Sequence, residues 1–198
     1  MKTTFLWGTT GSGKTLRAVQ LAVTAFLLGR QIWGNIHLKH IPYTYYDIPE
    51  LIDIVTHKNV SSTPKTMIMD EIQTAFDGRS SGSAQNRALS LFVSQCRKRG
   101  FDIIYTSQYI TGADSRLRVL TDKLVRCEAI VDRNDFGLGT FQDPEPVKFI
   151  YKTVDPKDPL SRVKKKTIYR DTARFFHQFY NTYEVVRPQS EYIGGEYV

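Results

Sequence analysis

A glycine-rich segment near the start of the chain has the residue types and spacing of a phosphate-binding loop. Gly8–Thr15 reads GTTGSGKT and satisfies the pattern G-x-x-x-x-G-K-[ST] at every required position. Glycines let the backbone curl so that successive N–H groups face an anion, and the helix that follows presents its positive end to the same anion. Lys14 is expected to reach the β- and γ-phosphates of a triphosphate, and Thr15 to offer its hydroxyl to Mg²⁺. The predicted nucleotide-binding residues are Gly8, Thr9, Thr10, Gly11, Ser12, Gly13, Lys14 and Thr15.

Two adjacent carboxylates supply the second half of the predicted site. The apolar run Met67–Met69 leads into Asp70 and Glu71, and ligands of open α/β sheets bind at the edge where parallel strands end. Asp70 is predicted to bind Mg²⁺ through a water molecule, and Glu71 to orient and activate the attacking water. An acidic pair after a strand is usually only a solvated strand end, but beside a complete phosphate-binding loop it indicates hydrolysis of ATP or a related triphosphate.

A glutamine follows another apolar segment that is expected to end at the same edge. The predicted strand Phe101–Thr106 leads into Ser107 and Gln108. A glutamine beside the γ-phosphate can hydrogen-bond both phosphate and water. We therefore predict a catalytic role for Gln108 together with Glu71 and Lys14, with a polar strand end of no catalytic role as the alternative.

The composition is that of one globular α/β domain with an anionic partner. The chain has 198 residues, of which 41% are hydrophobic and 24% charged, enough for one such domain and too few for two ordinary ones. The net charge of +7 favours an anionic partner, most commonly nucleic acid. Only two cysteines are present, which excludes a disulfide framework.

No segment of the sequence has the character of a membrane anchor or a secretory signal. The apolar residues after Met1 are interrupted at Gly8, well short of a signal sequence. The longest apolar stretch, Ala18–Leu28, contains Gln20 and Thr24 and is too short to span a bilayer. We expect a soluble protein without membrane insertion.

Strand and helix patterns alternate along the first part of the chain and then change. The predicted strands are Thr3–Trp7, Gln31–Leu38, Thr66–Met69 and Phe101–Thr106, and the predicted helices are Gly13–Leu28, Pro49–His57, Asn86–Arg99 and Ser115–Leu120. The segments Lys123–Asp132, Pro146–Asp155 and Val163–Arg170 alternate apolar and polar residues as antiparallel strands do, and a last helix covers Thr172–Tyr180. Asp77–Gln85 is predicted to be a flexible loop.

These patterns predict an α/β P-loop NTPase fold, RecA/ASCE-like, with a mainly parallel sheet flanked by helices. Residues 1–198 are expected to form a single ATPase domain. Its core covers about residues 1–122, and a β-rich antiparallel extension with the C-terminal helix covers about residues 123–198.

The order of the motifs resembles the FtsK–HerA superfamily of ring-forming, DNA-pumping ATPases. The run Cys96–Ile104 (CRKRGFDII) is the more specific part of this resemblance. Within the superfamily, the small size and the position of Gly8 resemble viral genome-packaging ATPases, in particular those of archaeal turreted icosahedral viruses. The resemblance implies an ATP-driven translocase that packages double-stranded DNA into a preformed capsid. It also implies a homo-oligomeric ring, a hexamer or a pentamer, with an arginine finger donated by a neighbouring subunit. Capsid or portal-vertex proteins would be partners, and the infected cell's cytoplasm or the virion the location.

Two alternatives share parts of the same pattern. The first is the nucleotide-binding domain of zonular-occludens-toxin-like phage assembly proteins. Those proteins carry a membrane-spanning segment, and its absence here favours the packaging interpretation. The second is a deoxynucleoside kinase, which the segment Asp70–Phe76 resembles. Two cysteines cannot build the four-cysteine zinc site usual in that family.

A basic segment precedes the predicted strand Phe101–Thr106. It contains Arg79, Arg87, Arg97, Lys98 and Arg99 and no acidic residue. A solvated basic face is one interpretation. The other interpretation divides the residues by role. The candidates for the arginine finger are, in order, Arg97, Arg87 and Arg99, with Arg116 and Arg118 as further candidates. The residues expected to contact nucleic-acid phosphates are Arg79, Lys98 and Arg99.

Overall fold

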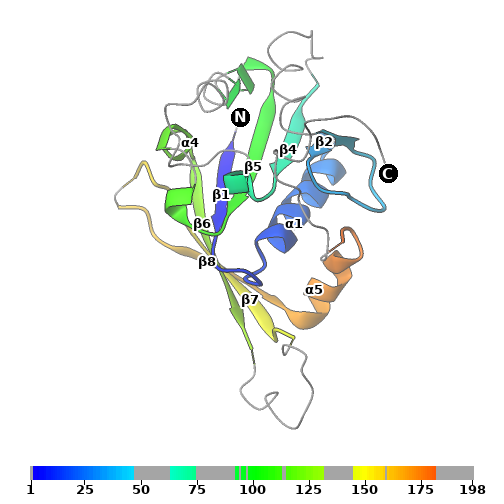
Figure 1. The fold of residues 1–198 in the computed structure, drawn as a ribbon, viewed down its shortest axis with the longest axis vertical. Coiled ribbons are helices and arrows are strands. Elements are labelled where there is room, and N and C mark those ends of the chain that lie inside the picture. Colours follow the sequence, from blue (N-terminus) through cyan, green and yellow to red (C-terminus); the bar gives the residue numbers. More distant parts are fainter. Residues whose placement is uncertain are drawn as a thin grey trace.

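One mixed sheet organises the molecule (Figure 1). In the computed structural model of the chain, the described residues are 2–46, 63–74, 92–93, 95–96, 98–112, 115–131, 145–158 and 160–181. Within them, an eight-stranded sheet has the order β3-β2-β4-β5-β1-β6-β7-β8. The strands are β1 (Thr3–Trp7), β2 (Gln31–Gly34), β3 (Thr44–Tyr45), β4 (Lys65–Met69), β5 (Phe101–Ser107), β6 (Lys123–Ile130), β7 (Lys148–Val154) and β8 (Lys164–Tyr169).

The parallel part of the sheet brings the predicted motifs to one edge. β1 pairs in parallel with β5, and β5 in parallel with β4. Parallel strands end on the same side, so the segments that follow Trp7, Met69 and Ser107 share the carboxyl edge. β5 lies between β1 and β4. The phosphate-binding loop and the acidic pair are therefore separated by one strand, and the predicted P-loop NTPase fold is confirmed.

β6 joins the two parts of the sheet. It pairs in parallel with β1 and antiparallel with β7, and β7 pairs antiparallel with β8. The predicted antiparallel pairing of Lys123–Asp132 is correct for only one of the two neighbours of β6. The alternation of apolar and polar residues shows that one face of the strand is exposed. It does not show whether a neighbouring strand runs parallel or antiparallel. The predicted antiparallel strands at the C-terminal end are present.

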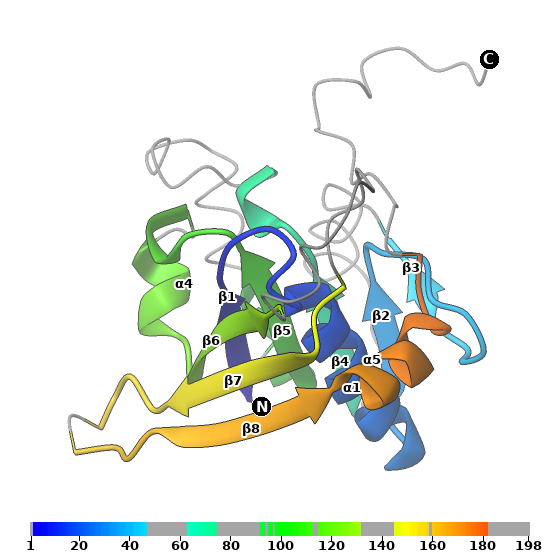
Figure 2. The same cartoon turned by 90° about the horizontal axis from the view of Figure 1, so that it is seen from below.

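Helices cover the sheet unequally. α1 (Lys14–Leu27) packs on one face through residues such as Leu16, Val19 and Val23, and α5 (Arg170–His177) lies beside it (Figure 2). The other face carries a second core that includes Phe5, and α4 (Ser115–Val119) contributes to it. Short 3₁₀ turns follow β4 (η1, Ile72–Thr74) and β5 (η3, Ile110–Gly112).

Several predicted boundaries differ from the observed ones. The strand predicted to reach Leu38 ends at Gly34, because Asn35 turns away to bond the backbone after β4, and Leu38 makes an isolated bridge with Tyr180. Residues 92, 93, 95, 96 and 98 are helical, within the predicted helix Asn86–Arg99. The predicted helix Pro49–His57 and the predicted loop Asp77–Gln85 lie outside the described residues.

Across the part of the chain that is described, no helix has the length and hydropathy needed to cross a bilayer.

Candidate nucleotide-binding site

The loop between β1 and α1 leaves the start of the helix open to an anion. Gly13 caps α1 with a left-handed backbone, φ +82°, and has no side chain to bond the first N–H groups of the helix. The first turn of α1 also contains no acidic residue. These N–H groups therefore remain available to a bound phosphate, which the positive end of the helix also favours.

Lys14 lies against the loop. It is 7% exposed, and its Nζ donates a hydrogen bond to the carbonyl oxygen of Thr9 over 3.0 Å. Burial lowers the pKa of Lys14, and the charges of Asp70 and Glu71 oppose that effect. The ammonium group is thus held on the loop backbone and faces the acidic pair.

The two predicted magnesium ligands are in direct contact. The hydroxyl of Thr15, in the first turn of α1, lies 3.2 and 3.0 Å from the two carboxylate oxygens of Asp70. Asp70 is 5% exposed, and burial raises the pKa of its carboxyl, while hydrogen bonds from Thr106 and Thr15 lower it. This contact joins the helix after β1 to the end of β4, so both halves of the predicted site form one site.

The donor set at this position fits a magnesium ion. Mg²⁺ prefers oxygen ligands and is usually held by one or two protein oxygens together with waters and substrate phosphates. Thr15 and Asp70 present such oxygens within hydrogen-bond distance of each other. They are the residues that would hold the ion, whose charge would be shared with the phosphates.

Thr106 connects the two carboxylate residues and was missed by sequence reasoning. Its hydroxyl donates to Oδ1 of Asp70 over 2.7 Å and accepts a hydrogen bond from the backbone N–H of Glu71 over 2.8 Å. Glu71 has a left-handed backbone, φ +48°, a conformation that non-glycine residues rarely adopt. Thr106 is the residue before the end of β5, so its place next to Gln108 was the available signal.

Gln108 follows β5 at the carboxyl edge and is half-buried. Its neighbour Ser107 donates a hydrogen bond to the carbonyl oxygen of Tyr109, which closes a turn directly after the strand. Gln108 therefore lies at the same edge of the sheet as Asp70 and Glu71.

The predicted arginines are mostly beyond what the structure describes. Arg79 and Arg87 lie outside the described residues, and so does Arg97. Lys98 is exposed at the end of the helical segment, and Arg99 is half-buried in the turn that precedes β5. They lie at the amino edge of the sheet, a strand length of about 20 Å from the loop edge. Neither residue can reach the phosphate-binding loop of its own subunit.

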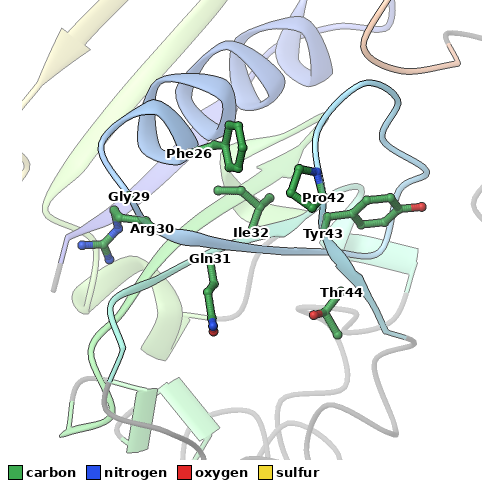
Figure 3. Close-up of a pocket in the computed structure, with 8 residues that line it drawn as sticks. All are labelled: Phe26, Gly29, Arg30, Gln31, Ile32, Pro42, Tyr43 and Thr44. Carbon is green, nitrogen blue, oxygen red and sulfur yellow. The ribbon is translucent and has the colours of Figure 1, made fainter.

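A hollow lies at the C-terminal end of α1 (Figure 3). It is lined by Phe26, Gly29, Arg30, Gln31, Ile32, Pro42, Tyr43 and Thr44. Gly29 follows the last turn of α1, whereas the phosphate-binding loop precedes the first. This hollow is therefore separate from the candidate nucleotide site.

Comparison with known protein families identifies the chain. Residues 2–168 match the family described as "Zonular occludens toxin (Zot)". The chain belongs to the Zot family. No curated protein matches its sequence.

Solved structures agree at the level of fold. The N-terminal domain of zonular occludens toxin from Neisseria meningitidis is 21% identical, with a TM-score of 0.60 over 91% of this chain and 98% of that chain. The genome packaging NTPase B204 from Sulfolobus turreted icosahedral virus 2, in complex with AMP, is 11% identical, with a TM-score of 0.55 over 82% and 96%. The predicted resemblance to a packaging NTPase is confirmed in the fold.

Family and fold together agree with a P-loop nucleoside triphosphatase. The motifs alone ranked the packaging ATPases above the Zot-like proteins, and the family match supports the Zot-like alternative as well. That ranking depended on the absence of a membrane-spanning segment. The matched Neisseria structure is itself only the N-terminal domain of its protein, so an absence within one domain does not argue against the family.

Proposed function

We propose that this member of the Zot family hydrolyses ATP with Mg²⁺ at the site formed by Gly8–Thr15, Asp70 and Glu71. The observation that carries the proposal is the contact of 3.0 Å between Thr15 and Asp70. A phosphate-binding loop without an acidic partner would bind anions only. Here the helix that follows the loop and the strand that leads into the carboxylates meet at one point.

Lys14 is the counter-charge for the β- and γ-phosphates in this proposal. Its Nζ bonds the Thr9 carbonyl in the structure, so it exchanges this weaker partner for phosphate oxygens when the triphosphate binds. A hydrogen bond between two charged groups is stronger than one to a neutral carbonyl. This exchange of partners favours binding of the triphosphate.

Glu71 is proposed to orient and activate the attacking water. Asp70 and Glu71 are adjacent in sequence, but Asp70 is buried against Thr15, whereas Glu71 is half-buried. Glu71 also has a left-handed backbone, φ +48°. Gln108, at the same edge, is proposed to hydrogen-bond the γ-phosphate and the water. Phosphoryl transfer depends mainly on such positioning and on charge stabilisation.

A further cation from a neighbouring subunit is part of the proposal. Within the described residues of the site, Lys14 is the cation that faces the acidic pair, and an arginine donated by another chain typically raises hydrolysis by about 10³- to 10⁵-fold. The candidates for this arginine finger, in a homo-oligomeric ring, stay Arg97, then Arg87 and then Arg99. Because Arg99 lies at the amino edge, it would have to reach the site of the next subunit.

The cargo is proposed to be double-stranded DNA, moved during packaging of a viral genome into its capsid, in the cytoplasm of the infected cell. The fold shared with a genome packaging NTPase and the net charge of +7 support this. A second candidate is an ATPase that drives the assembly of phage particles, which the family match favours. The two functions share the chemistry of the site and differ in what stimulates it.

Stimulation of hydrolysis distinguishes the candidates. Phosphate release from ATP is measured with the purified chain alone, with long duplex DNA, and with thymidine or deoxycytidine. The DNA motor predicts stimulation by duplexes of unrelated sequence, and binding that weakens steeply with salt because phosphate contacts release counterions. Hydrolysis without any response to DNA would favour the assembly ATPase. Phosphorylation of either nucleoside would contradict both proposals.

A further inference from the structure

A tyrosine of the antiparallel part of the sheet reaches the phosphate-binding loop. The hydroxyl of Tyr151, on β7, donates to the carbonyl oxygen of Gly13 over 3.1 Å, across a separation of 138 residues. Tyr151 is 1% exposed, and burial raises the pKa of its phenol, so the hydroxyl keeps its proton and remains a donor. The carbonyl of Gly13 also accepts the first hydrogen bond of α1, from the N–H of Arg17.

β7 also fills the space behind Gly13. A Cβ atom at this position would lie 2.5 Å from Cδ1 of Phe149 and 2.9 Å from the hydroxyl of Tyr151. The guanidinium group of Arg17, in the first turns of α1, lies 5.3 Å from the centre of the Tyr151 ring. β7 therefore supports both the end of the loop and the start of the helix (Figure 2).

The hydrogen bond orients one particular peptide unit. The carbonyl of Gly13 and the N–H of Lys14 belong to the same planar trans peptide, so they point in opposite directions. A carbonyl held toward β7 turns the N–H of Lys14 away from β7. In the G-x-x-x-x-G-K-[ST] pattern, backbone N–H groups of the loop cradle the α- and β-phosphates. Tyr151 thus acts on a phosphate donor without touching the ligand.

We propose that Tyr151 is a positioning residue of the nucleotide site, which holds the Gly13–Lys14 peptide in the orientation that binds the phosphates. The inference rests on the proposed function and extends it, because it gives the antiparallel extension a part in nucleotide affinity. β6, β7 and β8 are then more than an appendage to the parallel core. The effect concerns binding and leaves the chemical step to Lys14 and Glu71.

Tyr151→Phe tests the hydroxyl alone, because it keeps the ring under Arg17. The affinity for ATP with Mg²⁺, and KM and kcat for hydrolysis, are measured with the full chain. We expect the variant to bind ATP about three- to tenfold more weakly, as the loss of one buried hydrogen bond implies. KM should rise by the same factor, while kcat at saturating ATP stays close to that of the unaltered chain.

Two control variants separate positioning from general packing. Tyr105→Phe removes an equally buried hydroxyl, bonded to the carbonyl of Leu117 and to Thr121 instead of the loop. Phe149→Leu loosens the packing behind Gly13 but keeps the Tyr151 hydroxyl. Both should lower the melting temperature. Tyr105→Phe should leave the affinity for ATP within about twofold of the unaltered chain, and Phe149→Leu should lose less affinity than Tyr151→Phe.

The outcomes also separate this inference from the proposed function. If the unaltered chain does not bind ATP, the proposed function fails and this inference fails with it. If the unaltered chain binds ATP and Tyr151→Phe binds it equally well, only the positioning role is overturned. A loss of affinity in Phe149→Leu as large as that in Tyr151→Phe would also overturn it, because packing would then explain both.

Discussion

The side-chain amide of Asn35 holds both backbone polar groups of Asp70. Its Nδ2 donates to the Asp70 carbonyl oxygen over 3.0 Å, and its Oδ1 accepts a hydrogen bond from the Asp70 N–H over 2.7 Å. Both residues are buried. These two hydrogen bonds fix the backbone from which the Asp70 carboxylate projects. Asn35, the first residue after β2, therefore helps to determine where the carboxylate lies.

Asn35→Ala should therefore weaken both the fold and the metal site. The variant leaves a buried N–H and a buried carbonyl of Asp70 without their partner, and each such group costs about 1–3 kcal/mol. We expect a lower melting temperature and a higher Mg²⁺ concentration for half-maximal ATP hydrolysis. Thermal unfolding and a magnesium titration of the ATPase rate measure the two effects.

Thr121→Val is the matched control for this variant. Thr121 is 1% exposed, and its hydroxyl donates to the carbonyl of Leu117 in the turn after α4. The substitution should destabilise the fold without changing the magnesium dependence. If both variants shift the magnesium titration equally, the clamp on Asp70 has no specific role.

Thr106→Val should slow hydrolysis more than it weakens ATP binding. The valine cannot bond Oδ1 of Asp70 or the N–H of Glu71, which are the two contacts of the Thr106 hydroxyl. Hydrogen bonds to charged groups contribute about 1.5–3 kcal/mol, so kcat should fall by about 10- to 100-fold. Thr106→Ser keeps the hydroxyl and should retain most of the rate. Equal rates for Thr106→Val and Thr106→Ser would show that the bridge is not needed.

The two loop glycines with similar backbones should respond differently to alanine. Gly13 and Gly11 have φ of +82° and +74°, but a Cβ meets Phe149 and Tyr151 at Gly13 and nothing within 4 Å at Gly11. Gly11→Ala has only the left-handed strain, about 1–2 kcal/mol. Gly13→Ala adds a steric clash and should lose more melting temperature and more ATP affinity. Melting and binding curves that coincide for the two variants would contradict the close approach of β7.

The shared site of the proposed ring can be tested by mixing two inactive variants. Glu71→Gln keeps the finger, and Arg97→Ala keeps the water-activating carboxylate. Mixed rings contain some interfaces with both intact residues, so part of the ATPase activity should return. If the mixture assembles but stays inactive, Arg97 is not the finger, and the test moves to Arg87 and Arg99. Full activity in a dilute monomer would contradict a shared site altogether.

The sequence predicted the residues that touch phosphate and metal because their chemistry restricts both residue type and spacing. The Gly8–Thr15 motif and the strand end at Asp70 are local patterns, and parallel pairing of β1, β5 and β4 brings them together. The alternating strands of the C-terminal part were also visible as local patterns. The parallel pairing of β6 with β1 was not, because alternation carries no information on strand direction.

The supporting residues were not predictable in the same way. Asn35, Thr106 and Tyr151 act through one or two hydrogen bonds each, from three different strands or their ends. Each is an ordinary residue for its local segment, and its role depends on a partner 35, 36 or 138 positions away. Such contacts exist only once the sheet order is known.

Phosphate release by Glu71→Gln is the most direct measurement of the central claim, that Gly8–Thr15 and the end of β4 form one hydrolytic site. ATP binding and phosphate release are measured in the same sample, beside Lys14→Ala and the unaltered chain. We predict that Glu71→Gln binds ATP like the unaltered chain and releases almost no phosphate, because the contacts of Lys14, Thr15 and Asp70 remain. Lys14→Ala should lose both. Hydrolysis by Glu71→Gln at the unaltered rate, or an equal loss of ATP binding in both variants, would contradict the site described above.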